Sequence, residues 1–89
     1  MTKMQKSFLE GKINEMWALI DKYEETARAR SFAFDETGAQ EMYDKVDKLI
    51  YRIQGMKMVL DTMGYHVIAD VKQGKRRIVT DAQWTKAVS

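Results

Sequence analysis

The chain contains no cysteine, and this absence removes two kinds of site. Without thiols there is neither a disulfide framework nor a zinc site built on thiolates. Residues 1–6 are polar and lead straight into an amphipathic segment, without the apolar core of a secretory signal. We therefore expect a cytoplasmic protein.

Long apolar runs are also missing. A helix that crosses a bilayer needs about 20 predominantly apolar residues, and no run in this sequence approaches that length, so we expect no membrane span. The apolar fraction of 45% and the charged fraction of 31% are typical of a helix-rich globular protein. At 89 residues the chain can build one core, which predicts a single domain over 1–89.

Few residues are available for catalysis or metal binding. His66 is the single histidine, and the acidic residues lack the spacing of a zinc or EF-hand site. The five glycines stand singly, so there is no phosphate-binding loop. Acidic residues such as Asp44 and Asp61 fit the polar face of an amphipathic helix. We expect a non-enzymatic protein with no catalytic residue, metal, cofactor or small-molecule substrate.

Residues 3–30 have the spacing of an amphipathic helix. Apolar side chains recur at alternating intervals of four and three residues, at Leu9, Ile13, Met16, Ile20, Tyr23 and Ala27. This is the heptad seam along which coiled-coil helices pack. Thr2 and Gln5 have the spacing of a capping box, in which each side chain bonds the backbone of the other, so the helix is predicted to begin near Lys3.

Residues 31–36 interrupt this period and predict the connection to a second helix. Phe32 and Phe34 lie within the connection, and we expect them to fold back over the end of the helix pair to leave water. Thr37 and Gln40 repeat the capping-box spacing, so the second helix is predicted to begin there.

The clearest pattern in the chain is the seam of the second helix, over 37–63. Its members again alternate at intervals of four and three residues: Met42, Val46, Leu49, Ile53, Met56, Leu60 and Met63. Gly64 follows directly, where a residue without a β-carbon can close a helix in the left-handed conformation. The short connection forces the two helices to lie antiparallel.

Residues 65–80 alternate apolar and polar side chains around a turn and predict a β-hairpin. Two registers fit this pattern. A two-residue turn at Gln73 and Gly74 pairs Asp70 with Arg77, whereas a three-residue loop ending in Gly74 pairs Ile68 with Ile78. We favour the second register.

Residues 81–89 predict a tail or a short helix. Asp81 is a candidate cap for one helical turn, and Trp84 is expected to anchor the turn to the body of the protein. The sequence as a whole predicts an α+β fold that is mainly α: a long antiparallel helical hairpin, then a C-terminal β-hairpin and a short tail.

The apolar surface of the second helix exceeds what one partner helix can cover, because Tyr43 and Ile50 widen the seam. We therefore expect two helical hairpins to pair as a bundle, giving a homodimer or larger oligomer. The residues predicted to form a protein interface flank the seams and are Trp17, Tyr43, Ile50, Tyr51 and Met58.

Positive charge gathers in the C-terminal part of the chain, where residues 65–89 hold five Lys or Arg and two Asp or Glu. Four of these cations surround the predicted turn: Lys72, Lys75, Arg76 and Arg77. Such a cluster suits the phosphates of nucleic acid. The simpler interpretation is a solvated edge that prevents strand-to-strand aggregation, since no stacking aromatic residue lies among them.

Two functions follow. The first is a small interaction protein that self-associates and binds or inhibits another, unidentified macromolecule, in the style of bacterial or phage accessory proteins. The alternative is an accessory protein that binds nucleic acid through the basic hairpin. The alternative predicts an affinity that falls steeply with salt, because phosphate contacts release counterions.

Overall fold

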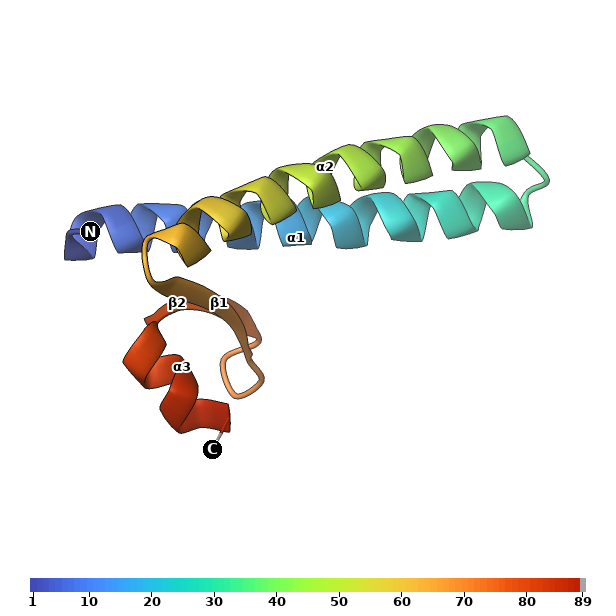
Figure 1. Ribbon diagram of the computed structural model, residues 1–89. Helices are drawn as coiled ribbons and strands as arrows, with labels where there is room; N and C mark the ends of the chain where they lie inside the picture. The colour runs from blue at the N-terminus through green and yellow to red at the C-terminus, as the bar shows by residue number, and fades with distance from the viewer. Residues whose placement is uncertain (89) are drawn as a thin grey trace.

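A computed structural model describes residues 1–88 of the chain. The elements follow in the order α1 (Lys3–Phe32), α2 (Glu36–Thr62), β1 (Tyr65–Asp70), β2 (Lys75–Thr80) and α3 (Asp81–Val88). The predicted α+β, mainly α fold is confirmed, and the predicted tail is a helix up to residue 88. Ser89 lies outside the described residues. Figure 1 shows the two long helices side by side, with the β-hairpin and α3 below one end of the pair.

The helices pack along the two predicted seams. Ile20 of α1 lies in one buried cluster with Leu49 and Ile53 of α2. Ala27 and Ala39 are buried near the connection, where their small side chains let the helices approach closely. The seam reading fails only at its end, because Met63 is 54% exposed beyond the last turn of α2. Neither long helix carries an apolar stretch able to cross a membrane within residues 1–88.

The helix starts were predicted with mixed success. At α1 the capping box is confirmed, because Gln5 N–H donates to Thr2 Oγ1 at 3.1 Å and Thr2 N–H donates to Gln5 Oε1 at 2.9 Å. At α2 the predicted box at Thr37 is wrong. Asp35 is the cap, and its carboxylate accepts from Gly38 N–H at 2.9 Å. An aspartate preceding the first turn caps as well as threonine does, and it starts α2 one residue earlier.

The expectation that Phe32 and Phe34 fold back is also wrong, since they are 90% and 93% exposed. The connection is short, and Asp35 N–H closes it by donating to Arg30 O at 2.8 Å. Phe34 adopts the left-handed conformation at φ +63° within this turn. The cluster at this end of the pair consists of Ala27, Ala39 and Met42 with Tyr23 packed against them, and it includes neither phenylalanine.

Both predicted hairpin registers are wrong. The strands pair Asp70 with Lys75, and a four-residue loop over 71–74 joins them. The Asp70 carboxylate accepts from the backbone N–H groups of Lys72 at 3.1 Å and Gln73 at 3.3 Å. The loop therefore starts at residue 71, one residue before the predicted three-residue loop and two before the predicted two-residue turn. Gly74 then completes it at φ +64°, a conformation that glycine adopts without strain.

The sheet lies between two layers of helix. Val67 and Ile78 are paired neighbours on one face, and they pack with buried residues of α1 and α2. His66 lies on the other face, where its ring stacks on Trp84 of α3 at 4.8 Å between centroids. Trp84 thus anchors α3 to the sheet rather than to the long helices. The α3 cap is Thr80 instead of Asp81, because the Thr80 hydroxyl accepts from Gln83 N–H at 3.2 Å.

Candidate functional site

The structure divides the four predicted cations into two pairs. Lys72 and Lys75 are exposed at the hairpin turn, and among residues 1–88 no carboxylate forms an ion pair with either ammonium group. Arg77 pairs with Asp70 at 3.3 Å, and Arg76 lies over the ring of Trp17 at 3.8 Å from its centroid. Two of the four cations are therefore engaged in holding the hairpin.

Asp70 connects the turn to this basic group. The backbone N–H of Gln73 is the main cause that lowers the pKa of the Asp70 carboxyl below its ordinary value, and Arg77 and the N–H of Lys72 act in the same direction. Partial desolvation opposes them without cancelling their effect. The carboxylate is thus stabilised in its charged form where it closes the turn.

Side chains of α1 hold the outer edge of β2. Asn14 donates from Nδ2 to Arg76 O at 3.0 Å and accepts from Arg76 N–H at 2.9 Å. One turn earlier, Glu10 accepts from Ile78 N–H at 2.8 Å. The spacing of four residues places both acceptors on one face of α1. Side chains of this helix therefore bond the edge of β2 that faces away from β1. With Arg76 above Trp17, this contact fixes the hairpin on α1.

A polar cleft of about 330 Å³ opens beside this contact. It is lined by Ser7, Glu10, Gly11, Asn14, Gln73, Lys75, Arg76 and Arg77. Three of the four predicted cations therefore meet in one place, and Lys72 does not line the cleft.

The residues predicted as a protein interface do not form one surface. Trp17 and Ile50 are half-buried and pack against the cluster between α1 and α2. Tyr43, Tyr51 and Met58 remain exposed, at 41%, 73% and 71%. Ile50 therefore packs against the core, and Trp17 is brought together with a member of the other predicted set, Arg76.

One apolar hollow was not predicted from the sequence. It is a groove of about 510 Å³ between α1 and α2, lined by Leu9, Arg52, Gly55, Met56, Val59, Leu60 and Met63. Val59 is 60% exposed there, although it is β-branched and apolar. The spacing contains a signal for it, because Val59 lies three residues after Met56 and four before Met63 and so widens the apolar surface of the seam at this end.

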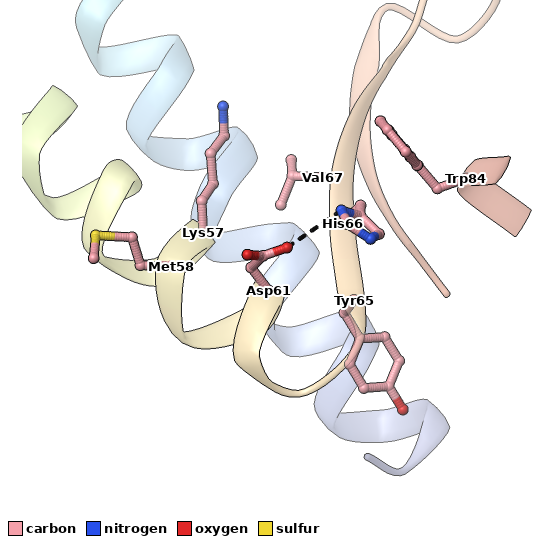
Figure 2. A pocket seen from close by; sticks show the side chains of 7 residues that line it. All are labelled: Lys57, Met58, Asp61, Tyr65, His66, Val67 and Trp84. Atoms are coloured by element: carbon pink, nitrogen blue, oxygen red, sulfur yellow. Dashed lines mark ion pairs between the residues drawn. The ribbon is translucent and has the colours of Figure 1, made fainter. Parts of the chain in front are cut away.

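A smaller hollow of about 280 Å³ lies at β1 and is lined by Lys57, Met58, Asp61, Tyr65, His66, Val67 and Trp84. Figure 2 shows the α2 residues on one side of β1 and Trp84 on the other. His66 lies between two carboxylates, with its Nδ1 3.7 Å from Asp61 and its Nε2 bonded to Asp81. This arrangement ties α2, β1 and α3 together at the floor of the hollow.

Within residues 1–88, no group of three or more side chains is arranged to hold a metal ion. The features that stand out are the basic cleft, the apolar groove and the hollow at β1. Comparison with protein-family models, curated proteins and solved structures finds no match to this chain, so these three surfaces carry the functional argument.

Proposed function

We propose that this chain is a non-enzymatic, cytoplasmic interaction protein that self-associates through the groove between α1 and α2. The observation that carries the proposal is an apolar groove of about 510 Å³ lined by residues of the two long helices and by Met63, directly after α2. The hairpin covers the opposite flank of α2. Water therefore contacts the groove side chains in an isolated chain, at a free-energy cost of about 25 cal/mol for each Å² of apolar surface.

The exposed area supports a second copy as the occupant of the groove. The chain exposes 6739 Å², whereas a compact monomer of this mass exposes about 5,400 Å². Its radius of gyration is 15.7 Å, against about 12 Å for a compact domain of this length. A standard interface buries about 800 Å² on each partner. The excess surface of this elongated chain is enough to supply such an interface.

The shape of the groove also suits a two-fold contact. A β-carbon at Gly55 would meet nothing within 4 Å, so the backbone of α2 is open to a close approach at that point. An antiparallel crossing of two α2 helices between Gly55 and Val59 keeps the two copies of Arg52 at opposite ends of the contact. The apolar side chains then pack in the middle, and two helical hairpins form a four-helix bundle.

Sedimentation or light scattering over a concentration series tests the proposal. We expect a dimer mass at micromolar concentration, and we expect Val59→Lys to weaken dimerisation at least tenfold, because it places a charge in the groove. Tyr51→Lys is the matched control, since Tyr51 is exposed on α2 outside the groove. A monomer mass for the unchanged protein at high micromolar concentration would reject the proposal.

Binding of nucleic acid is the second candidate function. The cleft that gathers Lys75, Arg76 and Arg77 favours it, and the engagement of both arginines within the fold weighs against it. A mobility shift with duplex and single strands decides the question. Lys72→Ala with Lys75→Ala should weaken binding and flatten its salt dependence if the hairpin contacts phosphates, and these changes leave Arg76 on Trp17.

A further inference from the structure

The two edges of the β-hairpin differ. At the outer edge of β2, side chains of α1 bind the N–H groups of Arg76 and Ile78, so these N–H groups face away from β1. In an antiparallel ladder, a residue paired with such a position also directs its backbone N–H and C=O away from the partner strand. The opposite residues are Ala69 and Val67. The N–H groups of Ala69 and Val67 therefore point away from β2, and no described hydrogen bond within residues 1–88 uses them.

This outer edge of β1 borders the hollow at β1. The lining includes Val67 from the face that packs on the long helices and His66 from the face that packs on α3. A hollow lined by both faces of one strand borders the edge of that strand, and Figure 2 shows the lining side chains of α2 and α3 on opposite sides of β1. Lys57 of α2 and Trp84 of α3 form the opposite walls. The free N–H and C=O groups of β1 thus lie in a recess open to another chain.

We propose that the outer edge of β1 binds an extended, acidic segment of a partner protein as a third strand. A row of outward N–H and C=O groups is complementary to an extended backbone. The charge around the recess selects the side chains of that backbone. Lys57 lines the recess, and the adjacent loop carries Lys72, whose exposed ammonium group has no carboxylate partner in the described chain. The one carboxylate in the lining, that of Asp61, lies 3.7 Å from the His66 ring.

The recess also fixes how the added strand presents its side chains. Side chains of a strand alternate between two faces, so every second residue turns toward α2 and the others toward α3. Met58 offers an apolar contact on the α2 side and Trp84 on the α3 side. An acidic residue on the α2 side comes beside Lys57. This surface is separate from the groove proposed for dimerisation, so a dimer can bind two such segments.

An alternating valine and glutamate octapeptide with a fluorescent label is the probe, and anisotropy measures its binding. Two N-methylated versions test the strand geometry, one methylated at every valine and the other at every glutamate. Only one of these sets of N–H groups can face β1. We expect one version to lose at least tenfold in affinity and the other to stay within threefold. The same peptide with lysine in place of glutamate should bind at least tenfold more weakly.

Ala69→Pro tests the edge from the side of the protein. Because the N–H of Ala69 points outward, proline there removes no bond of the hairpin, as on other edge strands. We expect it to weaken peptide binding at least tenfold with little change in thermal unfolding. Gln54→Ala, at an exposed site on α2, is the control and should leave binding unchanged. The N-methylated peptides use the unchanged protein, so they test the proposal even if Ala69→Pro unfolds the hairpin.

Three results would overturn strand addition. The first is no binding of the valine and glutamate peptide at millimolar concentration. The second is binding that both N-methylated versions keep or both lose. The third is a change of oligomeric mass in Ala69→Pro, because a second copy would then occupy the edge. Val59→Lys should keep its affinity for the peptide, so failure of the dimer and failure of strand addition are separate outcomes.

Discussion

Both ends of the helix pair pack along the same seams, but different elements contact the helices at the two ends. At the connection, small residues such as Ala27 and Ala39 let two helices close on each other, and the other side chains of this cluster, Met42 and Tyr23, also come from α1 and α2. At the other end, Ile13 and Leu60 meet Ile78 from the sheet, so three elements share one buried cluster. Helix pairing alone therefore completes one end, whereas the other end depends on the β-hairpin.

The difference continues on the two flanks of α2 at the hairpin end. Asp61, on one flank, lies 3.7 Å from His66 of β1 and lines the hollow at that strand. Val59, on the other flank, is 60% exposed in the groove. The hairpin covers one flank of α2, and it needs that helix surface because an isolated two-stranded sheet is only marginally stable. The other flank is left open. The open flank is why we assign self-association to this end.

The largest expected effect comes from removing the sheet residue that completes the core. Ile78 is fully buried, so Ile78→Ala should lower the free energy of unfolding by about 3 kcal/mol through lost burial and a cavity. Phe32→Ala, at the connection, is the control: its ring is 90% exposed, and we expect a change within about 0.5 kcal/mol. Chemical denaturation followed by circular dichroism measures both. Equal effects would show that the two ends do not differ as described.

Loss of the hydrogen bonds between Asn14 of α1 and Arg76 of β2 is expected to have the second largest effect on stability. Asn14→Ala removes two bonds to the backbone of Arg76 and leaves that N–H and C=O without their partner. We expect a loss of about 2 kcal/mol, since each partly buried bond contributes about 1 kcal/mol. Gln40→Ala removes an amide that bonds only the exposed Asp44 side chain, and it should have little effect. An Asn14→Ala variant that keeps its stability, with the hairpin amides still protected from exchange, would show that these bonds do not hold the hairpin on α1.

The helices could be predicted from the sequence because burial follows the seam. A period of 3.6 residues directly reports which side faces the core, and residues such as Ile13, Ile20 and Ile53 are accordingly buried. The α+β architecture followed from those helices and from the alternation after Gly64. These features depend on local periodicity, which one sequence contains in full.

The hairpin register and the sites depend on contacts that local patterns do not report. The loop length is set by the Asp70 carboxylate bonding backbone N–H groups two and three residues ahead. The position of Arg76 depends on Trp17 and Asn14, about sixty residues away in the chain. Periodicity gives the apolar residues beside the seam of α2 but not which flank the hairpin covers, so it does not show which flank stays open as the groove.

Substitutions at two glycines of α2, Gly38 near the connection and Gly55 toward the hairpin, should change stability by smaller amounts. A β-carbon at Gly38 would collide with the Asp35 carboxylate that caps the helix, whereas one at Gly55 would meet nothing within 4 Å. We expect Gly38→Ala to lower stability by about 1 kcal/mol through loss of the cap. We expect Gly55→Ala to raise it by about 1 kcal/mol through helix propensity. Measuring both in a Val59→Lys background keeps dimerisation out of the comparison, and a stabilising Gly38→Ala would show that the cap contributes little.

The smallest expected effect is the pH dependence at the hairpin turn. The pKa of Asp70 is lowered in the folded chain, chiefly by the N–H of Gln73. The carboxylate therefore stabilises the fold above its ordinary pKa of 3.8, and this contribution is lost as the pH falls through the lower, folded value. Asp70→Asn keeps an oxygen acceptor but removes the charge. The unfolding midpoint of Asp70→Asn should lie below that of the unchanged protein at pH 7, and the gap should close in strong acid. A gap that persists at low pH would mean that the shape of the side chain, and not its charge, holds the turn.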